Sequence, residues 1–159
     1  MRTATILAAM ASAVSAVTFH VQAVEGYDWD VTAWSAGCER SGCYYDFNVS
    51  GPADDQNPPR PAFLAYCSGF GEGAEYDECT LLDEGDVARR VVAKLLPAIR
   101  FNSTNTSTIA QIQVSFQYTD LEVSTTWWNF TGHGNSSYNQ FVAPLQNFTI
   151  KPDTISGVA

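Results

Sequence analysis

The chain has 159 residues, of which 45% are hydrophobic and 16% are charged. This composition is too apolar for a disordered chain and lacks the repetition of a collagen or a coiled coil, so it indicates one globular domain with a real core. The 17 acidic residues outnumber the 8 basic ones, and a net charge of −9 repels phosphate groups and anionic lipid. We therefore expect neither a nucleic-acid partner nor a membrane partner.

The N-terminus has the organisation of a secretory signal peptide. A short basic start is followed by an apolar run from Ala4 to Val17, and Val14-Ser15-Ala16 fits the small-x-small cleavage rule. We assign residues 1–16 to the signal peptide and residues 17–159 to a single secreted β-domain, with Val21-Gln22-Ala23 as an alternative cleavage motif. The apolar run is shorter than the roughly 20 residues of a membrane span. The predicted location is extracellular, and for a plant pathogen it is the host apoplast.

Glycosylation sequons also indicate secretion. Chance would place about 1.4 Asn-x-Ser/Thr sequons in a chain of this Asn, Ser and Thr content. The chain has six, which begin at Asn48, Asn102, Asn105, Asn129, Asn135 and Asn147. This excess is typical of a eukaryotic secretory protein whose surface tolerates sugars.

The four cysteines suit two disulfides in an oxidising compartment. Cys38 and Cys43 bracket a short turn between two predicted strands, so a local bridge would staple that hairpin. Cys67 and Cys79 bracket a Gly-rich acidic loop, and closing it would stabilise the fold by about 3 kcal/mol. We expect these two local pairings, although the sequence leaves the other two connectivities open. No Cys-x-x-Cys pair or nearby His completes a zinc site, so we predict no metal and no cofactor.

Alternation of apolar and polar residues dominates the chain and predicts β-strands. In the clearest case Ile112, Val114, Phe116 and Tyr118 alternate with glutamine and serine. A second alternation places Trp29, Val31 and Ala33 on one face of a strand and Trp34 on the other. Further strands are predicted at 17–24, 43–50, 63–67, 76–81, 121–131 and 147–151. The predicted fold class is all-β, a single compact antiparallel β-barrel or sandwich.

The segment 87–96 fits two structures. Asp86 could cap a helix in which Ala88, Val92 and Leu95 share a face, and this would be the one short helix of the chain. The same segment also alternates with period two and is rich in β-branched residues. We favour a strand, because ten residues that end at Pro97 would make a marginal helix.

Several motifs resemble a known fungal family. They are Trp29-Asp-Val-Thr-Ala-Trp, Gly37-Cys-Glu-Arg-Ser-Gly-Cys-Tyr-Tyr-Asp-Phe-Asn-Val, Phe63-Leu-Ala-Tyr-Cys and Glu75-Tyr-Asp-Glu-Cys. In their order along most of the mature chain they resemble the Alternaria major-allergen family of small secreted β-barrel proteins, which includes effectors and elicitors. The resemblance implies no established enzyme chemistry and suggests binding of a host extracellular protein or a small ligand. The prototype lacks the pair at 38 and 43 and has further C-terminal cysteines, so its covalent dimer is not carried over; we expect a monomer or a non-covalent dimer.

Candidate catalytic groups are few. His133 lies in a predicted turn between two sequons, and only His20 offers a second imidazole. Carboxylate pairs for glycoside hydrolysis could be drawn from Asp28, Asp30, Asp46, Asp120 and Glu122, as in any acidic β-protein. Seven acids between Glu72 and Asp86 lack the ladder spacing of a calcium loop, so a solvated acidic surface is favoured. We predict no catalytic residues and no enzymatic activity.

The leading hypothesis is therefore a secreted, glycosylated, disulfide-bonded and non-enzymatic fungal binding protein, an effector or allergen-like protein with a role in virulence. Trp127 and Trp128 point to opposite faces of a strand, so one of them is a candidate for an exposed contact. The alternatives are a small secreted hydrolase of RNA or polysaccharide, and a cell-wall glycoprotein.

Overall fold

The computed structural model describes residues 16–20, 25–97, 109–140 and 144–158. Nearly all of the predicted signal peptide and the sequons at Asn102 and Asn105 lie outside these ranges. The described residues form no helix. The strands are β1 (Ala16–His20), β2 (Trp29–Glu39), β3 (Gly42–Gly51), β4 (Phe63–Phe70), β5 (Asp77–Glu78), β6 (Thr80–Leu81), β7 (Arg89–Leu95), β8 (Ile109–Thr119), β9 (Trp127–Ser137) and β10 (Gln146–Val158). The all-β prediction is confirmed.

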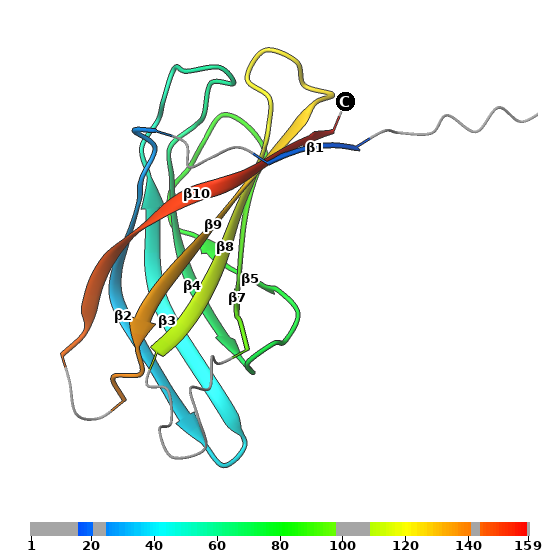
Figure 1. Cartoon of the computed structure of the whole chain (residues 1–159). Helices are drawn as coiled ribbons and strands as arrows, with labels where there is room; N and C mark the ends of the chain where they lie inside the picture. Colours follow the sequence, from blue (N-terminus) through cyan, green and yellow to red (C-terminus); the bar gives the residue numbers. More distant parts are fainter. Residues whose placement is uncertain (1–15, 21–24, 98–108, 141–143, 159) are drawn as a thin grey trace, which may run out of the picture.

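The strands form one antiparallel sheet that curls into a nearly closed barrel (Figure 1). Their order is β5-β7-β8-β9-β10-β2-β3-β4-β6, and β1 pairs with β10 beside this path. β10 turns the corner between the two halves, because Gln146–Ile150 pairs with β2 whereas Lys151–Val158 pairs with β9. A bulge between Pro152 and Thr154 follows shortly after this change of partner.

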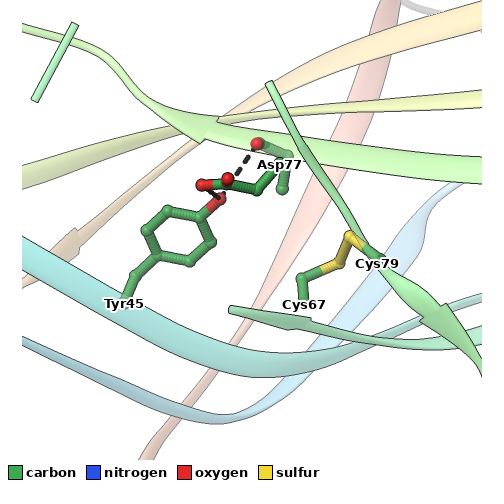
Figure 2. The surroundings of a disulfide bond; sticks show 5 residues. Tyr45, Cys67, Asp77 and Cys79 are labelled. Carbon is green, nitrogen blue, oxygen red and sulfur yellow. Dashed lines mark hydrogen bonds between the residues drawn. A yellow bond between two sulfur atoms is a disulfide. The ribbon is translucent and has the colours of Figure 1, made fainter. Parts of the chain in front are cut away.

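The opposite corner is made by a short segment that pairs with both free edges of the sheet. Within it β5 pairs with β7, and two residues later β6 pairs with β4. Between them the Cys79 N–H donates to the Val91 carbonyl at 2.9 Å, while the Cys79 sulfur is bonded to Cys67 on β4. Figure 2 shows this disulfide and, beside it, Tyr45 reaching from β3 to Asp77. We call residues 77–81 the closing segment.

The Tyr45 side chain is a second tie across this corner. Its hydroxyl donates to the Ala93 carbonyl of β7 at 2.9 Å and lies 3.5 Å from Asp77 Oδ2. Burial is the main cause that raises the pKa of Tyr45 well above its ordinary value. The hydroxyl therefore stays protonated and acts as a hydrogen-bond donor. A Cβ at Gly69 would overlap the Asp77 carboxylate and the Tyr45 hydroxyl. The close approach of the closing segment to β4 therefore requires glycine there.

The interior is filled mainly by aromatic and aliphatic side chains from both halves. Phe63 and Phe116 stack at 4.1 Å across the interior, and Trp29 packs edge-on against both rings. The fully buried large side chains are Trp29, Trp34, Tyr27, Tyr45, Tyr118, Phe47, Phe63, Phe116, Phe130, Leu95, Ile112 and Ile150. Burying aromatic rings of this size supplies most of the driving force for such a fold.

One charged side chain is buried among these rings. Arg60 is 3% exposed, stands 4.4 Å above the Tyr27 ring and lies 3.2 Å from the Asp54 carboxylate. Burial, the largest cause, raises the pKa of Tyr27 to about 12. The cation–π contact and the ion pair together compensate for the loss of water around the guanidinium. Arg60 thereby fixes the loop between β3 and β4 over one end of the barrel.

The segment 87–96 forms strand β7, as favoured from its alternation. Its alternate residues Val91, Ala93 and Leu95 are fully buried, whereas Arg90 points outward and is exposed. Pairing with β8 along its whole length gives this segment backbone partners that an isolated helix could not match.

The prediction for residues 29–34 was wrong in one respect. The backbone of Ala33 has a positive φ of 56°, and the register with β3 shifts between Thr32 and Ser35. This bulge turns Trp34 inward, so Trp34 is fully buried and not on the face opposite Trp29.

The predicted strand at 121–131 was also wrong in its first half. The strand begins at Trp127, and the residues before it form a turn. Asp120 Oδ1 accepts the backbone N–H groups of Glu122 and Val123 at 2.8 Å, and Thr126 N–H donates to the Val123 carbonyl. These hydrogen bonds satisfy the backbone locally, so the segment does not join the sheet.

The two disulfides contribute differently to this architecture, which leads to a testable expectation. Removing the bridge of the closing segment with Cys67→Ala and Cys79→Ala should lower the free energy of unfolding by about 3 kcal/mol, because the two sheet edges lose their covalent tie. The matched control is Cys38→Ala with Cys43→Ala at the end of a hairpin, which should lower the free energy of unfolding by about 2 kcal/mol. Urea unfolding monitored by tryptophan fluorescence measures both. A larger loss for the hairpin pair would contradict the closing role of Cys79.

Candidate functional site

The two predicted disulfides are both formed. Cys38 and Cys43 face each other across the β2–β3 hairpin with Cα atoms 3.9 Å apart, and Cys67 and Cys79 join β4 to the closing segment. The Glu72 carboxylate lies beside the first pair, but its Oε1 already accepts the Tyr138 hydroxyl at 2.5 Å. Because both sulfurs are in a disulfide, they offer no thiolate to a metal ion.

The acidic run from Glu72 to Asp86 does not converge on one point. Asp77 contacts Tyr45, and Glu78 pairs with Arg90 at 3.2 Å. Three others, Glu75, Glu84 and Asp86, are exposed. Some acidic residues of this run therefore make separate structural contacts, and only part of the run is the solvated acidic surface expected from the sequence.

Asp83 is the best-connected member of this run. Its carboxylate accepts the Arg89 guanidinium at 2.7 Å and the Leu64 N–H at 3.0 Å, and Arg89 also donates to the Ala62 carbonyl. Partial burial opposes ionisation of Asp83, but the hydrogen bonds and charge of Arg89 and the Leu64 N–H outweigh it and lower the pKa of Asp83. This network fixes the loop after the closing segment to the start of β4.

His133 does not lie in a turn, contrary to the prediction. It is in the middle of β9, opposite Gln113 and Lys151, with its side chain 42% exposed. Its Nδ1 lies 2.6 Å from Asp153 Oδ2 at the β10 bulge. In the described part of the chain no serine or threonine hydroxyl is hydrogen-bonded to His133. The imidazole is therefore oriented by a carboxylate, and among the described residues no hydroxyl is placed for it to activate.

The candidate carboxylate pairs for glycoside hydrolysis are mostly separated. Asp28 and Asp30 line a common pocket, of about 410 Å³, together with Ser50 and the backbone at Gly51. Asp28 also lies 3.7 Å from Lys151 Nζ. Asp46 lies in β3, and Asp120 and Glu122 belong to the turn before β9.

Trp127 and Trp128 divide between surface and core, as predicted. Trp127 is 37% exposed, whereas Trp128 packs against the core and its indole N–H donates to Asp120 Oδ2 at 2.6 Å. This hydrogen bond is the main reason that the pKa of Asp120 is lowered. Trp128 therefore has a structural role, because it ties the turn at Asp120 to β9.

The four described sequons all lie in strands. Asn135 and Asn147 are exposed, and Asn48 and Asn129 are partly exposed. The Asn147 Oδ1 accepts the backbone N–H of Ala33 at 3.0 Å, which supports the bulge in β2.

An apolar stripe covers the outward side of β4, and we call it the β4 face. Because alternate residues of a strand share a face, Leu64, Tyr66 and Phe70 point outward together and are 38%, 40% and 51% exposed. Leu82, whose N–H donates to the Leu64 carbonyl, is 53% exposed next to them. Tyr44 of β3 lies opposite Phe70, and Asn48 lies opposite Tyr66. Alternation in the predicted strand 63–67 places Leu64 and Tyr66 on the face opposite Phe63, whereas Phe70 lies beyond the predicted strand.

A polar groove of about 270 Å³ lies on the outward side of β7, β8 and β9. It is lined by Tyr76, Arg90, Val92, Ser115, Gln117, Asn129 and Thr131. The hydroxyls of Ser115 and Thr131 are 2.6 Å apart at its base, and both residues are buried. Tyr76 comes from the loop before β5, so its contact with residues of three strands was not predictable from alternation.

Neither surface can be assigned from known proteins, because no protein-family model, curated protein or solved structure matches this chain. Among the described residues no helix is long and apolar enough to cross a membrane. The β4 face and the polar groove are the two candidate sites, the first apolar and the second rich in hydrogen-bonding groups.

The Asp83 network predicts how stability depends on pH. Because the pKa of Asp83 is lowered in the folded state, its contribution is complete above the unfolded value near 3.9 and is lost as the pH falls through the folded value. Asp83→Asn should lower the free energy of unfolding by about 1 kcal/mol at pH 7, and the difference from the wild type should shrink below about pH 4. Urea unfolding at several pH values measures this, with exposed Glu84→Gln as control. An Asp83→Asn deficit that is constant down to pH 2 would contradict it.

Proposed function

We propose that this chain is a secreted, glycosylated and non-enzymatic binding protein that docks on a host extracellular protein through the β4 face. The observation that carries the proposal is the row of partly exposed Leu64, Tyr66 and Phe70 on one rigid strand. Contiguous apolar side chains on the surface of a small domain mark interaction sites, and tyrosine is enriched where binding energy is concentrated. The two disulfides support an extracellular location.

The β4 face is held rigidly, which favours binding without a large loss of entropy. β4 pairs with β3 along its length and with β6 at Ala65 and Tyr66. The inward side chain of Cys67 is bonded to Cys79, so the strand is fixed from beneath as well. A preorganised surface of this kind loses little conformational freedom on binding.

Charge favours a basic partner. The chain carries a net charge of −9, and a positively charged protein would be attracted over the range of the Debye length. Such attraction raises the rate of encounter, while the apolar side chains of the β4 face provide the close contact.

The resemblance to the Alternaria major-allergen family agrees with this proposal. Two of the motifs carry this resemblance close to the β4 face. Phe63-Leu-Ala-Tyr-Cys lies in β4, and Glu75-Tyr-Asp-Glu-Cys runs into the first three residues of the closing segment. An effector-like or allergen-like role therefore remains our interpretation of the family likeness.

The β4 face is tested by capture from host apoplastic fluid on immobilised protein. Replacing both aromatic rings with Tyr66→Ser and Phe70→Ser should reduce capture of any specific partner at least tenfold, because the buried apolar contact is lost. Leu145→Ser, which removes a 61% exposed apolar side chain elsewhere, is the matched control and should have no effect. The series is repeated with Asn48→Gln, since a glycan opposite Tyr66 would border the face. Equal capture by the double variant and the wild type would reject the β4 face.

A second experiment separates binding from catalysis. His133→Ala should leave activity in a host-response assay nearly intact, because the imidazole contacts Asp153 and no nucleophile among the described residues. An enzyme that used His133 as its general base would lose about two to four orders of magnitude in rate with the fold unchanged. A well-secreted His133→Ala protein without activity would overturn the binding proposal and favour the hydrolase.

A further inference from the structure

We propose that the protein's own glycan, attached at Asn129, packs in the polar groove on β7, β8 and β9. The ligand class is the N-acetylglucosamine core of an N-linked oligosaccharide, folded back onto the strand that carries it. This inference rests on the proposed passage through the secretory pathway, but it concerns a surface other than the β4 face.

Two rows of outward residues, set by the strand register, build the groove. In the first row Gln117 of β8 lies between Arg90 of β7 and Asn129 of β9. In the second row Ser115 lies between Val92 and Thr131. Asn129 therefore stands at the margin of the groove, with the Gln117 amide and the Arg90 guanidinium across the sheet from it and hydroxyl groups in the neighbouring row.

Tyr76 provides the aromatic wall that a sugar ring requires. It is 37% exposed, its hydroxyl lies 3.4 Å from Ser115 Oγ, and Lys94 Nζ lies 4.3 Å from its ring centroid. These contacts fix the ring over the second row. A pyranose presents C–H groups on its faces and hydroxyl or acetamido groups at its edges, so it matches an aromatic wall beside a polar row.

The volume of the groove and the state of the Asn129 amide also fit an attached sugar. About 270 Å³ is just below the range of pockets for drug-sized ligands and suits a group of about one or two sugar residues. The Asn129 amide makes no hydrogen bond to another described residue, so its nitrogen is free for attachment.

Other described sequons lack this combination. Asn135 lies on the same strand and the same side, but it is exposed and its Oδ1 is 3.4 Å from Gln111 Nε2. Asn147 supports the Ala33 bulge. Of the four described sequons, only Asn129 lines the groove, so its glycan should be packed whereas that of Asn135 should extend into solvent.

The experiment uses the full chain secreted from a eukaryotic host and the same chain made in bacteria without glycans. Glycopeptide mass spectrometry should find Asn129 occupied. In the secreted protein Asn129→Gln should lower Tm by about 2 to 4 °C, whereas Asn135→Gln should not change it. Both substitutions should be silent in the bacterial protein. Tyr76→Ala should lower Tm more in the glycosylated protein than in the Asn129→Gln background, because the two groups contact each other.

Each other outcome has a distinct meaning. Occupancy of Asn135 or Asn147 with an empty Asn129, or additive effects of Tyr76→Ala and Asn129→Gln, would overturn the packed glycan and leave the secreted binding protein intact. An absence of glycan at every sequon would overturn both proposals. Binding of free chitobiose to a secreted protein with an empty Asn129 would reassign the groove to an external saccharide.

Discussion

The fold depends on how the closing segment satisfies two sheet edges at once. Without β5 and β6, the seven strands from β7 to β4 would leave unpaired N–H and C=O groups at the edges β7 and β4, which is a hazard for aggregation. The segment 77–81 pairs first with β7 and then with β4, and Cys79 lies at the point where it changes partner. The disulfide to Cys67 and the hydrogen bond to Val91 hold this point in place. The barrel is thereby closed by five residues.

Closure also explains where the candidate surfaces lie. Because the barrel interior is filled by packed aromatic rings, outward side chains are the ones left for recognition. On β4 these are leucine, tyrosine and phenylalanine, and on β7, β8 and β9 they are polar. The same period-two rule thus produces an exposed apolar stripe on one side of the molecule and a polar groove on another.

Much of the fold was predictable because burial and period two coincide along most strands. The exceptions arose where a local interaction interrupts the period. The bulge at Ala33 shifts Trp34 inward without a marker in composition, and Leu121 and Val123 resemble strand residues although the Asp120 carboxylate holds them in a turn. Both disulfide pairings were predictable because each closes a short loop. The groove was not, since Tyr76 meets residues of three strands only after the barrel has formed.

The position of β10 has a consequence for the order of events during synthesis. β10 is the last described strand, yet it lies between β9 and β2 in the middle of the sheet, so neither half can be joined until it has left the ribosome. The Thr131 hydroxyl, which an enzyme must read to modify Asn129, is buried against Ser115 once β8 and β9 pair. Late arrival of the central strand keeps the nascent chain open. For the secreted protein that we propose, the topology thus leaves a period in which sequons that end up in strands are still accessible to modification.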